Sequence, residues 1–340
     1  MSVPDPGPTS SFAVPGYTFL WLTGWLWHVA RWMAVLATTY RVNEQTGDPL
    51  LVQLVGATFM APMFLGGALA GTLTDRLDRH RTVMTSLAVL VPVAGLMGLA
   101  VSADAAPTAV SYGFIFCVGI GNVLDMTSRR SIAFGLVGAG LLTNAAAYET
   151  LALHFGSMAG SLSGGAVLAG LGAGAVYLSV AAVYLAALGS FARAARIGQP
   201  STDPSTDRSD GGDATSAVAD LMAGFGLLVD HVVLRQFLVT TVLMNFFYYA
   251  FIPLVPAFAE DLGVGPFLTG VLASALGMGT MTGAFVIARL QPTRRGLIHI
   301  VGSLGAMAML IVFANLTWFP AAFAALFVAG LFGSGFGTTQ

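Results

Sequence analysis

Residues 71–81 have the sequence GTLTDRLDRHR, a short charged stretch between two long apolar segments. The charges stand at a helix end, where water still reaches them and a neighbouring helix is close enough to be bound. We predict a charged latch made of Gly71, Asp75, Arg76 and Arg79. The alternative is a plain loop whose arginines only anchor the topology.

The composition of the chain is that of a membrane protein. Of its 340 residues, 56% are hydrophobic and only 9% are charged, which a soluble domain does not reach without exposing large apolar surface. Cys117 is the single cysteine, which excludes an intrachain disulfide and a multi-cysteine metal site. The net charge of -2 argues against a nucleic-acid partner. The sequence has no phosphate loop and no nucleophile elbow, so we expect no enzyme, no ATP-driven pump, no cofactor and no metal.

Hydropathy predicts about ten membrane spans, because a bilayer core takes roughly 20 apolar residues as a helix. The predicted spans are 18–38, 50–72, 82–102, 108–127, 146–169, 173–192, 236–257, 264–288, 297–315 and 318–337. Arginines gather in every second connection, Arg129 and Arg130 among them. Since short cytoplasmic loops collect positive charge, the amino terminus is predicted to be cytoplasmic.

Two stretches break the apolar pattern. Residues 1–17 are rich in Pro and Ser and lack Arg and Lys, which predicts a short disordered cytoplasmic tail and no secretory signal. Residues 199–216, QPSTDPSTDRSDGGDATS, cannot bury apolar surface and are predicted to be a cytoplasmic linker that leads into an amphipathic helix. We therefore expect an all-α polytopic membrane protein with two helical bundles. Its parts are the tail, an amino-terminal six-helix bundle at 18–198, the linker with its amphipathic helix at 199–235, and a partial carboxy-terminal bundle at 236–340.

Three motifs in the first half resemble those of one transporter superfamily. Residues 71–81 resemble the loop signature Gly-x-Leu-x-Asp-Arg of the major facilitator superfamily. Residues 20–32 and 144–165 resemble the first and fifth helices of its enterobactin-exporter and macrolide-efflux branch, with Ser161 in place of the usual Pro. The resemblance implies twelve spans, so this sequence would hold six spans plus about four of an expected six and be carboxy-terminally incomplete.

Three glycines in the fifth span recur every four residues and form one smooth helix face, namely Gly156, Gly160 and Gly164. We predict that a facing helix slides or rocks against this stripe. The superfamily ties such a stripe to exporters, which favours efflux over uptake. Simple tight packing is the alternative for each glycine.

Ionisable side chains at membrane depth are costly and therefore become candidates for a substrate or proton pathway. His28 and Arg31 lie three residues apart on one helical face and are predicted to line the central cavity. Arg31 either binds an anionic substrate group, holds a carboxylate partner or snorkels to the outer interface. His28 either exchanges protons or is a packed core histidine.

Glu149 precedes Gly156 by two helical turns and so lies on the glycine face. It is the best-placed carboxylate for proton coupling. The alternative is an interfacial glutamate that pairs with Arg129 or Arg130. His154 lies off that face and is a weaker candidate for the same pathway.

Asn122, Asp125 and Arg129 follow an i, i+3, i+7 pattern at the inner end of the fourth span. By resemblance to the superfamily, we predict that they form a charge relay with Asp75 and Arg79 of the latch. In that role they gate the transporter and do not bind its substrate.

In the seventh span, Thr241, Asn245, Tyr248 and Tyr249 are predicted to share one helix face. Amide, hydroxyl and aromatic groups on a wide surface suit a bulky amphipathic organic ligand. Packing of the tyrosines in the interfacial aromatic belt is the alternative.

These features predict a secondary active transporter of the plasma (inner) membrane, a proton antiporter that exports a drug-like or siderophore-like small organic molecule by alternating access. Its partners would be that substrate, protons and the lipid bilayer. Two alternatives stay open: a transport-incompetent truncated membrane protein, indicated by the chain's end at Gln340, and an uptake transporter of the same fold.

Overall fold

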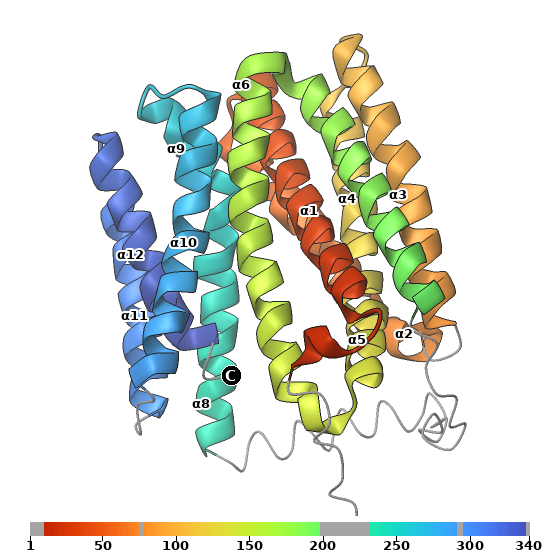
Figure 1. Ribbon diagram of the computed structural model, residues 1–340. Helices are drawn as coiled ribbons and strands as arrows, with labels where there is room; N and C mark the ends of the chain where they lie inside the picture. The colour runs from red at the N-terminus through yellow and green to blue at the C-terminus, as the bar shows by residue number, and fades with distance from the viewer. Residues whose placement is uncertain (1–9, 75–77, 198–231, 291–294, 338–340) are drawn as a thin grey trace, which may run out of the picture.

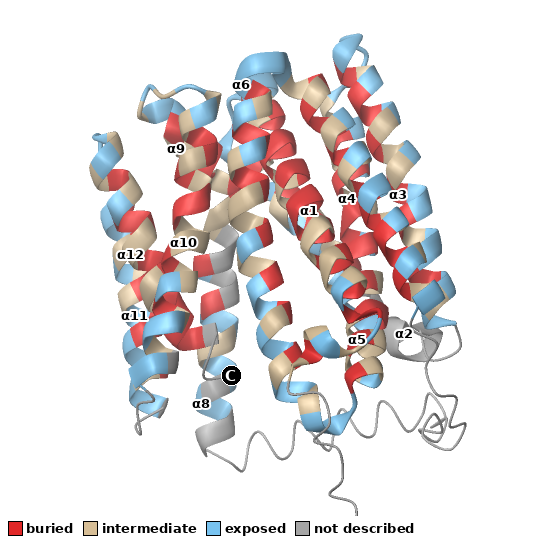
Figure 2. Ribbon diagram, in the orientation of Figure 1, coloured by how far each residue is buried: buried red, intermediate tan, exposed pale blue. Residues whose placement is uncertain are grey.

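The protein folds as two helical bundles that stand side by side (Figure 1). The computed structural model describes residues 10–74, 78–197, 232–290 and 295–337, and every regular element in them is a helix. Buried residues, red in Figure 2, occur on the helices of both bundles. They form one hydrophobic core in the first bundle and a separate one in the second.

Five long helical segments make the first bundle: α1 (Tyr17–Thr46), α2 (Pro49–Thr74), α3 (Arg79–Ser102), α4 (Thr108–Leu124) and α6 (Leu142–Ile197). α4 continues through a π-helical turn at Asp125–Arg129 into the short α5 (Arg130–Val137). α6 reverses direction at Gly172, whose φ of 80° and ψ of 174° interrupt the helix (Figure 1). Glycine accepts this backbone because it has no Cβ. The two arms of α6, 142–171 and 173–197, are therefore separate helices, each longer than the roughly 20 residues that a bilayer core takes.

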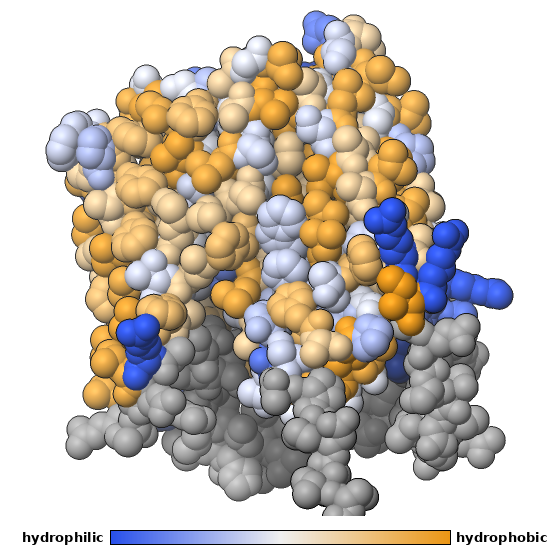
Figure 3. All heavy atoms as spheres, in the orientation of Figure 1, coloured by the Kyte–Doolittle hydropathy of each residue, from blue (hydrophilic) through white to orange (hydrophobic). Residues whose placement is uncertain are grey.

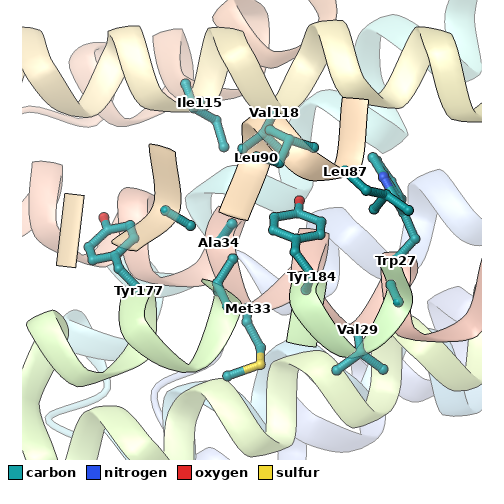
Figure 4. Packing of buried hydrophobic residues seen from close by; sticks show 14 of the residues in the cluster. Trp27, Val29, Met33, Ala34, Leu87, Leu90, Ile115, Val118, Tyr177 and Tyr184 are labelled. Carbon is teal, nitrogen blue, oxygen red and sulfur yellow. The ribbon is translucent and has the colours of Figure 1, made fainter. Parts of the chain in front are cut away.

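The core of the first bundle forms around α1. Figure 4 shows apolar side chains of α1, α3, α4 and the second arm of α6 that pack together, among them Met33, Leu90, Val118 and Tyr184. The first arm of α6 covers another side of α1 (Figure 1).

The second bundle contains α8 (Val232–Leu243), α9 (Val255–Asp261), α10 (Pro266–Leu290), α11 (Arg295–Phe313) and α12 (Phe319–Gly337). Between α8 and α9 the chain forms a π-helical turn at Met244–Tyr248 and a 3-10 helix at Tyr249–Leu254. The span predicted at 236–257 is thus not one regular helix. Pro253 and Pro256 explain part of the difference, because proline lacks the N–H that a continuous α-helix requires.

Six helical stretches in the described part of the chain are long and apolar enough to cross a membrane by length and composition. One of them, Ala139–Ile197, contains both arms of α6. Apolar side chains also cover most of the face seen in Figure 3. Since such a surface is stable in lipid and not in water, the predicted all-α polytopic membrane fold is confirmed.

Each bundle has two ends. We call the lower end in Figure 1 the arginine-rich end; α1 and α3 begin there and α5 ends there, whereas the connection from α1 to α2 and the turn within α6 lie at the opposite end. The predicted linker at 199–235 and its amphipathic helix fall almost entirely outside the described residues.

The described part of the tail, residues 10–16, is ordered at the arginine-rich end, whereas the sequence predicted a disordered tail. Ser11–Ala13 forms a 3-10 turn, and the Ser11 backbone N–H and hydroxyl donate to Asn144 Oδ1 at 2.9 and 2.8 Å. The Phe12 ring packs edge-on against Tyr148, with 4.5 Å between ring centroids. The Pro- and Ser-rich composition of the tail gave no indication of this aromatic contact.

Candidate functional site

A buried network of three charged side chains lies at the arginine-rich end of the first bundle. Arg129 Nε donates to Asp125 Oδ1 at 2.8 Å, and Arg129 Nη1 lies 2.9 Å from both carboxylate oxygens of Glu149. The exposed fractions of Asp125, Arg129 and Glu149 are 3%, 1% and 1%. One cation thus faces two carboxylates away from water, and full ionisation of the three groups leaves one negative charge in excess.

Local backbone geometry and one glycine create the space for this network. The π-helical turn holds both Asp125 and Arg129, and such turns often occur at functional sites. On α1, a Cβ atom at Gly24 would lie 2.4 Å from Arg129 Nη1. Only glycine leaves the guanidinium enough room, so α1 also belongs to the site although it contributes no charge to the network.

Asp125 and Glu149 differ in how Arg129 binds them. Both oxygens of Glu149 contact the guanidinium, whereas Asp125 Oδ2 is buried and has no hydrogen-bond partner among the described residues. Asp125 and Arg129 belong to one turn, so their ion pair is local. The Arg129–Glu149 pair instead joins the end of α4 to α6.

Arg31 is a second buried cation, at the middle of α1. Its exposed fraction is 9%, and its Nη1 donates to Asn122 Oδ1 at 3.0 Å. Three aromatic rings surround the guanidinium, with its central carbon 5.2 Å from the ring centroid of Trp32, 5.6 Å from Trp27 and 5.9 Å from Phe59. In the described parts of the chain Arg31 forms no ion pair, and it does not extend to the outer interface.

Neither candidate histidine forms an ion pair in the part of the chain that the structure describes, although His28 interacts electrostatically with Arg31 and Arg129. His28 is buried, its ring meets Trp27 edge-on at 5.7 Å, and its Nδ1 has no partner within the described residues. His154 lies half-buried on the first arm of α6, where its carbonyl accepts a hydrogen bond from the Ser157 hydroxyl at 2.8 Å. The His154 ring interacts electrostatically with His28, and no hydrogen bond joins the two among the described residues.

The three glycines of the predicted stripe face α1. A Cβ atom would lie 2.5 Å from His28 Cβ at Gly156, 2.5 Å from the Val29 carbonyl oxygen at Gly160 and 3.3 Å from a Leu36 methyl carbon at Gly164. The first arm of α6 therefore contacts α1 backbone to backbone, as small residues allow in membranes.

Gly160→Val is expected to destabilise the protein by about 1–3 kcal/mol, because the added side chain overlaps a backbone carbonyl that cannot rotate away. Thermal unfolding of the purified protein in detergent measures this effect. Gly170→Val is the matched control, since nothing lies within 4 Å of its Cβ position on the same arm. Equal losses of stability in the two variants would contradict the tight α1–α6 contact.

Comparison with protein families identifies the fold. Residues 20–340 match the Major Facilitator Superfamily. The chain belongs to this superfamily. Its members are membrane transporters and not enzymes, so the expectation of a non-enzymatic transporter fold is confirmed. No curated protein matches the chain.

Solved structures agree with the superfamily fold. A bacterial homolog of the human lysosomal transporter Spinster, in an inward-facing and unoccupied conformation, superposes with a TM-score of 0.70 at 18% identity over 98% of this chain and 75% of its own. A D-xylose-proton symporter gives 0.67 at 17% identity over 94% of this chain and 79% of its own. At such identities the likeness establishes the fold alone. The enterobactin-exporter and macrolide-efflux branch is not identified by these comparisons.

The superfamily's loop motif can be followed only in part. Asp75 and Arg76 lie outside the described residues, and Gly71 lies in α2 where side chains are not described. Arg79 is the first residue of α3 and is exposed. Asp78, which the sequence analysis did not single out, caps α3 by accepting hydrogen bonds from the backbone N–H groups of residues 80 and 81 at 2.9 and 3.2 Å. The latch and its relay therefore stay a prediction.

The predicted ligand face of the seventh span does not have the assumed geometry. The π and 3-10 turns replace the regular α-helical spacing. Tyr248 is buried in the core of the second bundle, and its hydroxyl lies 3.5 Å from the Ala329 carbonyl oxygen. The side chains of Asn245 and Tyr249 lie outside the described residues.

The two superfamily bundles meet closely along α6 and α10. A Cβ atom at Gly165 would lie 2.7 Å from the Gly270 Cα atom, so the helix backbones touch there. At the opposite end, the Asn43 side-chain amide donates to Glu260 of the second bundle. A cavity of about 370 Å³ lies beside this link, lined by Tyr40, Asn43, Glu44, Pro256, Glu260, Gly263, Val264 and Thr269. The sequence held no sign of these contacts between distant residues.

Proposed function

We propose that the protein is a proton-coupled secondary transporter that exports a small, drug-like or siderophore-like organic molecule across the plasma membrane by alternating access. The observation that carries the proposal is the buried group of two carboxylates around one arginine, Arg129. Buried carboxylates of a membrane transporter are candidates to carry a proton, and in this group the proton would bind to Asp125 or Glu149. Release of that proton restores the full ion-pair network.

A single helix links this proton site to the contact between the bundles. The first arm of α6 carries Glu149, then the glycine stripe against α1, then Gly165 against Gly270 of α10. Protonation of Glu149 weakens its bond to Arg129 and loosens the attachment of α6 to the end of α4. The smooth glycine contact lets α6 shift along α1, which would move its contact with the second bundle.

The proposed direction rests on sequence. The fifth-span motif resembles exporters of the superfamily, and the arginine distribution favours a cytoplasmic amino terminus. A neighbour of the same fold is described as a proton symporter, which supports proton coupling without fixing the direction.

Transport assays in membrane vesicles test the proposal. Inverted vesicles that contain the protein are expected to accumulate organic dyes from a test panel when their interior is acidic. A gradient of about one pH unit stores about 1.4 kcal/mol per proton, enough for about a tenfold accumulation of a neutral dye in one-for-one exchange. Vesicles without the protein and addition of a protonophore are the controls. Accumulation that survives the protonophore would contradict proton coupling, and proton-driven accumulation only in right-side-out vesicles would identify an uptake transporter.

A further inference from the structure

We propose that Arg31 is the binding subsite for a carboxylate group of the substrate, which makes the transported molecule an organic anion with an aromatic or apolar body. This inference rests on the proposed transport function and names its substrate class. It follows from a comparison of Arg31 with the other buried arginines of the first bundle.

Arg129 is neutralised by direct ion pairs within the protein, whereas Arg31 has no direct ion pair among the described residues and interacts with the Asp125 carboxylate only at longer range. Two carboxylates contact Arg129. The hydrogen-bond partner of Arg31 is the neutral amide of Asn122, and its Nε and Nη2 atoms donate to no described residue. A guanidinium buried in this way favours an anionic ligand, because its unused donors match the two oxygens of a carboxylate.

Arg41 on the same helix also lacks an ion pair, but its surroundings are different. Its Nη2 donates at 2.7 Å to the Ala106 carbonyl oxygen in the connection between α3 and α4, and its Nε is sealed from solvent. No nitrogen of Arg31 is sealed off without a partner. Arg41 therefore anchors a chain turn, whereas the nitrogens of Arg31 that have no partner are not completely enclosed by the protein.

The surroundings of Arg31 also define the rest of the ligand. Trp27, Trp32 and Phe59 lie around the guanidinium and hold it by cation–π contact. Such walls suit the aromatic or apolar body of a small molecule, while the arginine orients its acidic group. Arg31 lies near the middle of the 30-residue α1, the depth at which secondary transporters bind their substrates.

An anionic substrate agrees with export. The membrane potential, negative inside, drives an anion outward by about 2.3 kcal/mol per charge at 100 mV. Exchange of an outgoing anion for an incoming proton would therefore draw on both the potential and the pH gradient.

Binding of three probes with one ring system tests the inference: 2-naphthoate, 2-naphthamide and 2-naphthylmethylammonium. The purified full-length protein in detergent is titrated with each probe, and quenching of tryptophan fluorescence reports binding because Trp27 and Trp32 flank Arg31. The wild-type protein is expected to prefer the carboxylate over the amide. Arg31→Gln should weaken 2-naphthoate binding about ten- to hundredfold and leave 2-naphthamide binding nearly unchanged. Arg41→Gln, which removes the same charge from the same helix, should bind 2-naphthoate as the wild type does.

Two results would overturn the subsite: wild-type protein that does not prefer 2-naphthoate over 2-naphthamide, or Arg31→Gln that binds 2-naphthoate like the wild type. If Arg31→Gln does not fold, two other measurements decide. One is the preference of the wild type between the probes, and the other is 2-naphthoate binding by Arg31→Lys, which keeps the charge. Transport separates this inference from the proposed function. Carboxylate binding without proton-driven transport would support the subsite and contradict the proposed function. Proton-driven transport of only the amide or the ammonium probe would support the proposed function and contradict the subsite.

Discussion

Replacement of Arg129 by Met is expected to destabilise the protein by about 3–5 kcal/mol, because removal of one partner leaves buried charges without compensation. Asp125 and Glu149 would both remain away from water, and neither has another cation within ion-pair distance among the described residues. Chemical unfolding of the purified protein in detergent, followed by tryptophan fluorescence, measures the loss.

Arg130→Met is the matched control for this variant. Arg130 is the next residue, is only partly buried and forms no ion pair in the part of the chain that the structure describes. Its loss is expected to cost less than about 1 kcal/mol. Neutralising all three network residues, as Asp125→Asn, Arg129→Met and Glu149→Gln together, should restore much of the lost stability, since no charge is then left buried. A single Arg129→Met variant as stable as Arg130→Met would show that the network is not the buried ion-pair group described above.

Hydropathy predicted the all-α membrane fold because the bilayer determines directly how long and how apolar each span must be. A helix that crosses lipid must be long, apolar and internally hydrogen-bonded, and each of these demands is written in a contiguous stretch of residues. The reversal between predicted spans at 146–169 and 173–192 follows the same logic, and Gly172 supplies the backbone geometry. Hydropathy does not predict whether a span is one regular α-helix. The π and 3-10 turns at Met244–Tyr248 and Tyr249–Leu254 depend on packing against neighbours.

The candidate site was accessible from sequence only where its residues lie close together in the chain. Asp125 and Arg129 are one turn apart, and pairing of Glu149 with Arg129 was an alternative at a separation of 20 residues. Arg129 was also counted among the loop arginines, because the pattern of charges along the sequence does not distinguish a solvent-exposed arginine from a buried one. The Arg31–Asn122 bond spans 91 residues and the Asn43–Glu260 link 217. Such pairs depend on how helices are arranged, and a single sequence carries no local signal for them.

Glu149→Gln is expected to abolish proton-driven transport while the protein stays folded. The amide keeps an oxygen that can accept from Arg129 Nη1, so the shape of the contact is preserved. Arg129 then faces one carboxylate, Asp125, and the charges balance without a proton. Accumulation driven by about one pH unit should fall from about tenfold to that of vesicles without a gradient.

The effect is assigned to Glu149 and not to Asp125 because only the Glu149 ion pair connects two helices. A proton on Asp125 changes a contact within one turn, whereas a proton on Glu149 changes how α6 is held. Substrate exchange without a gradient should therefore survive in Glu149→Gln, since the bundles can still alternate. Glu44→Gln is the control: it makes the same chemical change at an exposed glutamate of α1, at the opposite end. Unchanged proton-driven accumulation in Glu149→Gln would remove Glu149 from the mechanism, and loss in both variants would point to a general effect of carboxylate removal.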